Sequence, residues 1–347
     1  MMIQPTYLDH NHVSKTEVLK VPFSKKVRQY AEAVLCRVGF WLCSRLPYTW
    51  LLTIARGLGA CAYKIAFSER QVALANLSLA LGNSYTPYER SVIARKCFQS
   101  FARTTLETLS AERLSWNRLD RYMVFAPGAL DLLAKLVAQK RGLIALTFHY
   151  GNWEWLSLAW GLAGYPATVV AQPIKNPKVE TLFYSRRQQA GHHLVWRRRA
   201  ALQLYKTLKR GGIIGLLVDL NSSIEEGGSF FNFFGLPVLT TRMVGFLALR
   251  TGSPIVCSVA YPQEDGRYRI EIGPEISYDP TASLEAEIDE ITKCWLVHCE
   301  KVIRKHPEFW MWMYKRWKVR PVPEIGGYPF YSFYDPKVKA SLAIAGL

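Results

Sequence analysis

The chain has 347 residues, of which 50% are hydrophobic, and it carries a formal net charge of +17 at pH 7. Its length allows one large domain or two modest ones, and its mean hydropathy of zero excludes a protein made mainly of membrane-spanning helices. The excess of Lys and Arg indicates a polyanionic partner, which can be nucleic acid, an anionic lipid surface or an acidic carrier protein.

The composition favours a membrane surface among these partners. The basic residues are spread along the chain and form no zinc finger or RNP signature, so we expect no nucleic-acid partner. The chain has 11 Trp and 18 Tyr, whose amphipathic rings suit a membrane–water interface, although core packing accounts for many of them. Seven cysteines without a CxxC pair or a grouping with histidine indicate thiols in a reducing compartment and no metal site.

The first apolar stretch runs from residue 31 to residue 67. Its longest uncharged run, residues 46–55, has ten residues, whereas a spanning helix needs about 20. Cations interrupt the stretch at Arg37, Arg45, Arg56 and Lys64. Together with Trp41 and Trp50, this pattern favours helices that lie on the membrane surface. A helical hairpin packed on the catalytic domain is the alternative, and the two interpretations can hold for different faces.

The rest of the chain reads as helices followed by alternating strands and helices. Thr86, Pro87 and Glu89 form a capping box that predicts a helix to residue 110, and another helix follows Pro127. Predicted strands cover 142–148, 167–172, 192–196, 212–219, 254–261 and 267–273, and predicted helices cover 152–163, 177–190, 199–210, 241–252 and 282–305.

This order predicts an α/β fold with a mixed, mostly parallel sheet flanked by helices and one antiparallel hairpin near residues 264–266. Membrane-associated helices would precede it. We divide the chain into an N-terminal tail and membrane-associated helical region (1–70), a catalytic domain (71–325) and a C-terminal tail (326–347).

The segment TFHYGNWEW, residues 147–155, contains the candidate catalytic residues. His149 ends a predicted strand, at the sheet edge where ligands gather in α/β proteins. Glu154 falls in the first turn of the next helix, so the imidazole can fold back onto its carboxylate. Glu154 would then fix the tautomer while the other ring nitrogen acts as general base. A lone pair of this spacing is more often structural, so its context decides.

No GxSxG elbow supplies a nucleophilic serine, which argues against a serine-type lipid hydrolase. Without a protein nucleophile, we expect His149 to deprotonate the hydroxyl of the acceptor itself. The reaction would then proceed without a covalent enzyme intermediate.

The segment resembles the His-x4-Asp/Glu motif of the lysophospholipid acyltransferase superfamily, and most of all its lipid A biosynthesis (lauroyl/myristoyl) acyltransferase branch. Further blocks resemble that family in the same order, at residues 73–82, 175–191, 209–219, 232–241 and 306–318. They include Asn176-Pro177, Arg187-x3-Gly191, the Phe-Phe-Gly-x-Pro segment that contains Phe234, and a closing block with Arg316. The resemblance covers roughly residues 70–320 and implies the fold of that superfamily.

The resemblance implies transfer of an acyl chain from acyl carrier protein, or from acyl-CoA, to a hydroxyl of a lipid A precursor. His149 and Glu154 would be catalytic, at the cytoplasmic face of the inner membrane. The expected partners are acyl carrier protein, an anionic lipid acceptor and the membrane surface, with no cofactor. The candidate substrate-binding residues are Asn152, Trp153, Gln172, Asn176, Arg187, Asp219, Phe234 and Arg316.

Some roles stay open at this point. Asp219 can line the acceptor site or cap a turn, and Phe234 can line an acyl pocket or fill the core. Gln172 stands where the family often has arginine, so the oxyanion would rely on backbone N–H groups near residues 151–153 or on another cation. The acceptor can also be another glycolipid, an aminolipid or a lysophospholipid. A noncatalytic basic protein that binds membranes or nucleic acid is the remote alternative.

Overall fold

The computed structural model describes residues 23–197, 200–281, 283–336 and 338. A seven-stranded sheet in the order β1-β9-β8-β2-β5-β3-β4 forms its centre. The strands are Met123–Phe125 (β1), Leu143–Thr147 (β2), Ala167–Ala171 (β3), His193–Trp196 (β4), Ile213–Leu217 (β5), Ile255–Pro262 (β8) and Tyr268–Ile272 (β9). Every neighbouring pair is parallel except β8 and β9, which confirms the predicted mixed, mostly parallel sheet.

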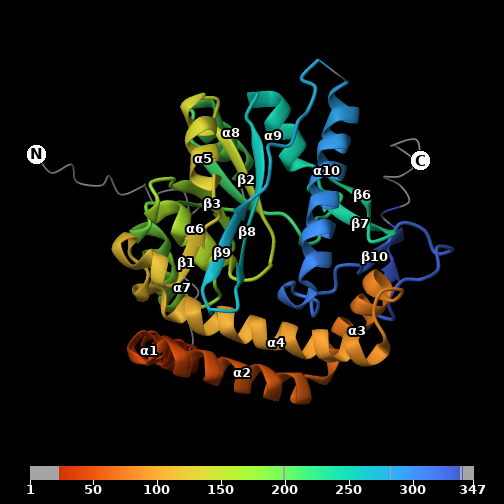
Figure 1. Ribbon diagram of the computed structural model, residues 1–347. Helices are drawn as coiled ribbons and strands as arrows, with labels where there is room; N and C mark the ends of the chain where they lie inside the picture. The colour runs from red at the N-terminus through yellow and green to blue at the C-terminus, as the bar shows by residue number, and fades with distance from the viewer. Residues whose placement is uncertain (1–22, 198–199, 282, 337, 339–347) are drawn as a thin grey trace, which may run out of the picture.

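Helices cover both faces of this sheet (Figure 1). Their bounds are Ala129–Ala138 (α5) and Trp153–Leu162 (α6) on one face, and Ala200–Lys209 (α8), Met243–Thr251 (α9) and Leu284–Lys305 (α10) on the other. Strand β2 shows why both faces are apolar, because successive side chains of a strand point to opposite sides. Leu143 and Ala145 pack in the core with α5 and α6, whereas Ile144 and Leu146 pack in the core with α8, α9 and α10.

A layer of helices runs across one end of the sheet (Figure 1). It consists of α1 (Phe23–Arg45), α2 (Tyr48–Ile65) and α4 (Pro87–Leu109), with α3 (Phe67–Leu81) beside them. Helix α2 buries Leu51, Ala55 and Gly59. A Cβ at Gly59 would lie 2.4 Å from the Cα of Gln99, so glycine permits the close crossing with α4. Helix α2 of the N-terminal stretch therefore packs closely on α4, whereas α1 contacts α4 and α7 (Pro177–Gln189).

The outer face of this layer remains apolar. Trp50, Ile54 and Leu58 of α2 are exposed and form a stripe at helical spacing that lies beside its buried face, one position before each buried residue. Among the described helices, none combines the length and the hydropathy that a bilayer crossing requires. Association of these helices with a membrane surface stays a prediction.

The predicted elements include no strand between residues 219 and 241, where the structure has a β-hairpin that contains the Phe-Phe-Gly-x-Pro segment. Strands β6 (Gly228–Phe233) and β7 (Leu236–Thr241) pair antiparallel outside the main sheet. Phe234 and Gly235 form the turn with φ of 51° and 86°. Phe-Gly lacks the Asn or Asp that normally marks such a turn. Tertiary contacts stabilise it instead, since the amide of Phe234 donates to Glu300 at 2.7 Å and Arg304 lies over its ring.

Helix α7 (Pro177–Gln189) lies between β3 and β4 in the chain, and the short β10 (Val319–Arg320) and β11 (Phe333–Tyr334) pair near the C-terminus. Three 3₁₀ helices complete the described elements, at Ala111–Arg113, Trp116–Arg121 and Pro307–Phe309. The expected boundary at residue 70 falls inside α3, and the division into three regions stays a prediction.

Candidate active site

His149 and Asp219 meet at the carboxyl ends of two neighbouring parallel strands. Strands β2 and β5 pair with Thr147 opposite Leu217, and each functional residue lies two positions beyond. Nδ1 of His149 lies 2.8 Å from Oδ1 of Asp219, and the backbone amide of His149 donates to Oδ2 at 3.0 Å. The indole of Trp310 also donates to Oδ2, at 2.9 Å. Asp219 is therefore the carboxylate that orients His149.

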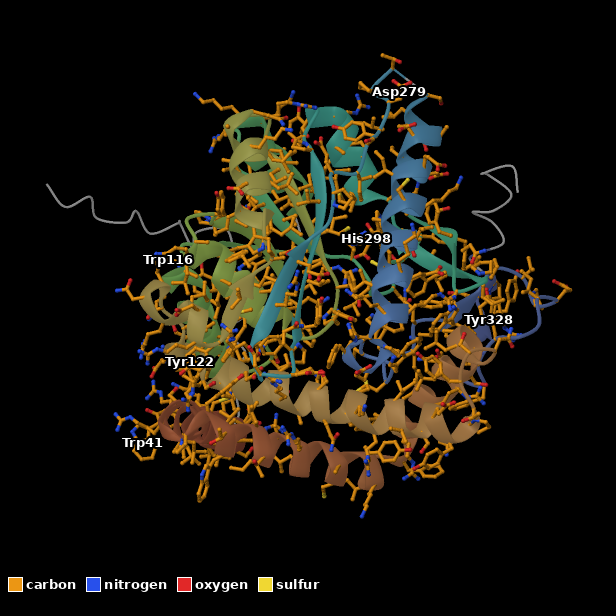
Figure 2. The ribbon with its side chains drawn as sticks, in the orientation of Figure 1. Trp41, Trp116, Tyr122, Asp279, His298 and Tyr328 are labelled. Atoms are coloured by element: carbon orange, nitrogen blue, oxygen red, sulfur yellow. The ribbon has the colours of Figure 1, made fainter. Side chains whose placement is uncertain are left out.

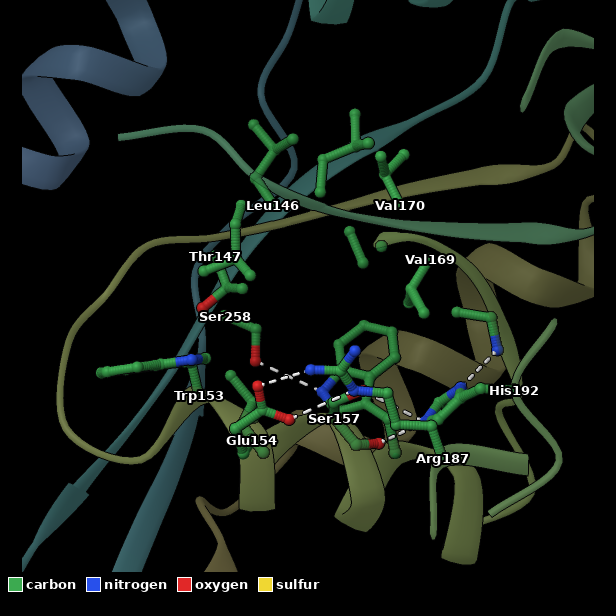
Figure 3. Close-up of a pocket in the computed structure, with 17 residues that line it drawn as sticks. Leu146, Thr147, Trp153, Glu154, Ser157, Val169, Val170, Arg187, His192 and Ser258 are labelled. Atoms are coloured by element: carbon green, nitrogen blue, oxygen red, sulfur yellow. Dashed lines mark hydrogen bonds and ion pairs between the residues drawn. The ribbon is translucent and has the colours of Figure 1, made fainter. Parts of the chain in front are cut away.

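Glu154 does not occupy the position that the sequence suggested. Its carboxylate accepts hydrogen bonds from Arg187, at 2.7 Å and 3.3 Å (Figure 3). The imidazole of His149 is bonded to Asp219 instead. The expectation that Glu154 fixes the tautomer of His149 is corrected in this respect, because Asp219 already occupies Nδ1. Because β5 lies beside β2, Asp219 reaches the imidazole of His149, although Glu154 is much nearer to His149 in the sequence.

The electrostatics of the pair favour a charged imidazole. Burial by itself lowers the pKa of His149, but the charge and hydrogen bond of Asp219, with a smaller contribution from Glu154, raise it above its ordinary value. Burial likewise opposes ionisation of Asp219, yet His149 and the hydrogen bond from Trp310 bring the pKa of that carboxyl below its ordinary value. Asp219 is thus ionised, Nδ1 of His149 carries a proton, and Nε2 is left as the basic nitrogen.

His149 lines a groove of about 770 Å³. Four of the other candidate residues also line it, namely Trp153, Glu154, Gln172 and Arg187. Beyond them, the walls are mainly apolar and come largely from β3, β4, β5, α7, α8 and α9, and include Phe183, Leu204 and Val244. The groove therefore combines a basic nitrogen, a cation and a long apolar wall, which suits a substrate with a polar reacting group and an alkyl chain.

A second cavity, of about 90 Å³, adjoins the groove at the Glu154–Arg187 ion pair. It lies between α6 and strands β2, β3 and β5, and the small residues Ala145, Ala167 and Gly215 leave it open (Figure 3). A Cβ at Gly215 would lie 2.9 Å from Cγ1 of Val169. The ion pair thus separates a large open groove from a small apolar chamber.

Five candidate substrate-binding residues are absent from the described lining of both cavities, so their direct contact with substrate stays a prediction. They are Asn152, Asn176, Asp219, Phe234 and Arg316, and all are buried. Asn176 caps α7 and donates to Glu32 and to the carbonyl of Gln29 in α1. Arg316 donates to Asn221, Thr240 and the carbonyl of Leu239.

Burial lowers the pKa of Arg316 to about 10, and the charge of Asp219 opposes this shift. Arg316 thus contributes a positive charge near Asp219 from inside the protein. Phe234 packs against Trp312 and Trp317. Both residues therefore support the structure around Asp219 and do not face the groove.

In the turn between His149 and α6, two of the backbone amides expected to bind the oxyanion already donate to other groups. The amide of Gly151 donates to the carbonyl of Phe309 at 2.9 Å, and that of Asn152 donates to the carbonyl of Ala260 at 3.0 Å. Gly151 has a φ of 57°, and a Cβ there would lie 1.8 Å from the oxygen of Ala260, so only glycine fits. Arg187, which lines the groove, is a cation that can take the place of these amides.

Ser157 and His192 form the closest approach to a nucleophilic serine at this site, with Oγ 3.2 Å from Nε2 (Figure 3). Nδ1 of His192 accepts a hydrogen bond from the amide of Ala167 at 3.0 Å, so the proton of the neutral ring is on Nε2. That nitrogen donates to the carbonyl of Ser157 at 2.7 Å and cannot act as its base. The geometry gives no support to a serine hydrolase.

Comparison with known proteins decides the family. The sequence model described as bacterial lipid A biosynthesis acyltransferase matches residues 20–319. The chain belongs to this lipid A acyltransferase family. It is 26% identical over 288 residues to the lipid A biosynthesis palmitoleoyltransferase of Escherichia coli K12, covering 82% of this chain and 90% of the relative.

Two further members of the lipid A acyltransferase family are similar at comparable levels. The lauroyltransferase of Escherichia coli K12 is 25% identical over 284 residues, with 81% of this chain and 89% of the relative covered. A lipid A biosynthesis acyltransferase of Haemophilus influenzae is 25% identical over 284 residues, with 80% and 86% covered. The chain is thus an enzyme that transfers acyl groups, as the resemblance implied.

Proposed function

We propose that this acyltransferase moves a fatty acyl chain from acyl carrier protein to a hydroxyl of a lipid A precursor. The family and its relatives support lipid A as the acceptor. The single observation that carries the mechanism is the His149–Asp219 pair, which opens onto a groove with a long apolar wall. The net charge of +17 suits an acidic carrier protein and a phosphorylated acceptor.

In the proposed reaction, Nε2 of His149 accepts the proton of the acceptor hydroxyl as its oxygen attacks the thioester carbonyl. Asp219 stabilises the imidazolium that forms, through the bond to Nδ1. The tetrahedral intermediate collapses, the carbon–sulfur bond breaks, and the imidazolium returns its proton to the leaving thiolate. The products are the acylated lipid and the free carrier thiol, so no covalent enzyme intermediate is needed.

Arg187 and Glu154 take different parts in this proposal. Arg187 lines the groove and donates to Glu154, so its guanidinium is held beside the reacting centre. We assign it the stabilisation of the thioester oxyanion or of an acceptor phosphate, since Gln172 carries no charge. Glu154 positions Arg187. Burial lowers the pKa of His149, whereas the charge of Asp219 and, to a smaller extent, that of Glu154 raise it.

The test is to incubate the purified enzyme with acyl carrier protein thioesters and a tetra-acylated lipid A precursor, and to analyse the products by mass spectrometry. We expect one added acyl chain and one equivalent of free carrier thiol. Parallel reactions with acyl-CoA, a lysophospholipid and an aminolipid test the alternative donor and acceptors. Transfer to one of these but not to the precursor would reject lipid A as the acceptor.

We further propose that the outer face of α1 and α2 lies on an anionic membrane surface, beside the cytoplasmic leaflet of the inner membrane. The exposed apolar side chains of this face include Leu35, Trp41, Trp50, Ile54 and Leu58 (Figure 2 labels Trp41). Exposed cations flank them at Lys25, Lys26, Arg37, Arg45, Arg56 and Lys64. Apolar burial and attraction to anionic headgroups act together on such a face.

Substitution of both Trp41 and Trp50 by serine should weaken binding to vesicles that contain phosphatidylglycerol by more than about tenfold, because two rings no longer enter the interface. Sedimentation with vesicles at several salt concentrations measures the effect. Trp116→Ser is the matched control, since Trp116 is 54% exposed but lies in a 3₁₀ helix outside α1 and α2 (Figure 2). Equal binding by the double variant and the control would contradict the assignment of this face.

A further inference from the structure

A buried carboxylate lies behind the catalytic turn and has no place in the mechanism so far. Glu107 of α4 is completely buried, and its two oxygens accept four hydrogen bonds, each of 2.7 Å. Oε1 accepts from Tyr48 and Arg103, and Oε2 accepts from Asn152 and Tyr268. We call these five residues the Glu107 cluster. Every lone pair of the carboxylate is used, and Arg103 balances its charge.

The Glu107 cluster joins four separate parts of the fold. Tyr48 begins α2, Arg103 and Glu107 belong to α4, Tyr268 begins β9, and Asn152 precedes α6. Each partner reaches the same carboxylate from a different direction, so its position is fixed by the fold as a whole. A buried ion pair of this kind adds little net stability compared with apolar packing. Its value lies instead in the geometry that it imposes.

That geometry is imposed on the turn between His149 and Glu154. The side-chain oxygen of Asn152 accepts from the amide of Trp155 at 2.8 Å and so begins α6, while its amide nitrogen is held by Glu107. The indole of Trp155 donates to the carbonyl of Glu107 at 2.8 Å, and Thr104 donates to the carbonyl of Gly151 at 2.8 Å. Helix α4 therefore binds the turn from one side at three points.

The segment that follows α10 also binds the turn, and it packs on α4. The amide of Met311 donates to the carbonyl of His149 at 3.2 Å, and the carbonyl of Phe309 accepts from the amide of Gly151. Both α4 and this segment thus hold the turn. Of the contacts with α4, the hydrogen bond from Asn152 to Glu107 alone joins two side chains. Its donor and acceptor can therefore be swapped by mutation, whereas the other two contacts end on backbone carbonyls.

We propose that Glu107 is a positioning residue for acyl transfer: through Asn152 it sets the start of α6, and hence the placement of His149 and Glu154 at the groove. This inference rests on the proposed function for its kinetic consequence. A shift of about 1 Å in a reacting group costs about a hundredfold in rate. Loss of the bond between Glu107 and Asn152 should therefore lower kcat far more than it changes KM.

The test exchanges the two polar groups. In Glu107→Gln alone, the amide group of the new side chain faces the amide group of Asn152, so two donors meet. In Asn152→Asp alone, two carboxylates meet. In the double variant, Nε2 of the new glutamine donates to the new aspartate and to the hydroxyl oxygen of Tyr268, whose hydroxyl donates to Glu107 in the wild type. Oε1 still accepts from Tyr48 and Arg103, and the aspartate still caps α6. The net charge of the cluster is the same as in the wild type.

We expect kcat to fall by about thirtyfold or more in each single variant with KM within about threefold, and to recover to within about fivefold of wild type in the double variant. Thermal unfolding is measured on all four proteins. Thr292→Val is the control, because Thr292 is buried and hydrogen-bonded in α10 but lines neither cavity, so it should lower stability without lowering kcat.

A second readout does not depend on turnover. In NMR spectra of enzyme with ¹³C-labelled histidine, the His149 ring signals and their titration should shift in each single variant and return in the double variant. Singles that lose thermal stability but keep the wild-type kcat and the wild-type His149 titration would overturn the positioning role. So would a double variant that regains stability but not the His149 titration. Absence of transfer by the wild-type enzyme would reject the proposed function instead, and the NMR outcome would still decide the position of His149.

Discussion

Replacement of His149 by alanine is expected to reduce kcat for acyl transfer by about 10³-fold or more, since the acceptor hydroxyl then has no base within the groove. The fold should be retained, because the side chain of His149 is partly exposed and lines an open groove. Mass spectrometry of the acylated product measures the rate, and thermal unfolding checks that the variant is folded.

His193 provides the matched control for this substitution. It begins β4, its side chain is exposed, and it lines neither cavity. His193→Ala should transfer acyl chains at the wild-type rate. If His149→Ala kept more than about a tenth of that rate, general-base catalysis by His149 would be rejected, because a positioned base contributes at least about a hundredfold.

Asp219→Asn is expected to lower kcat by about 10³-fold with little change in KM. The new amide group would donate to Nδ1 of His149, which places the ring proton on Nε2 and removes the basic lone pair from the groove. Glu154→Gln should have a much smaller effect, about tenfold, because it keeps a hydrogen bond to Arg187 and leaves the bond between His149 and Asp219 intact. Steady-state kinetics on the two variants compare the roles directly.

The pH dependence gives an independent check on the same pair. The base must be neutral to act, so kcat/KM rises as the pH passes upward through the pKa of His149. Burial opposes a high pKa, but Asp219 raises it, so this acidic limb should lie above the ordinary value of about 6.5. Removing the charge with Asp219→Asn should move the limb of the residual activity to lower pH. A larger loss, or a larger pH shift, in Glu154→Gln than in Asp219→Asn would make Glu154 the orienting residue.

Local signals in the sequence are sufficient for most of the sheet and its helices. The capping box at Thr86 and Glu89 is present at the start of α4. All six predicted strands match observed strands within about two residues at each end, because glycine, proline or a turn breaks the pattern there. The position of His149 at the end of β2 follows from the same local pattern.

The pairing of His149 with Asp219 could not be read from local patterns. The two residues lie 70 positions apart, and their contact depends on β5 lying beside β2, which the strand order alone decides. Once that strand order is known, the contact can be predicted, because each residue lies two positions beyond the end of its strand. Glu107 gives still less warning, since three of its four donors, Tyr48, Asn152 and Tyr268, come from distant parts of the chain.

The origin of the groove walls has a consequence for how such enzymes diversify. The reacting pair belongs to the ends of two strands in the middle of a seven-stranded sheet, where few substitutions are tolerated. Part of the groove lining comes from connecting segments, namely Gln172, Ile174, Arg197, Leu220, Asn221, Ser222 and Glu226. Loops accept insertions and replacements more readily than strands. Descendants of this chain can therefore acquire new lipid preferences by altering those segments while they inherit the same reaction unchanged.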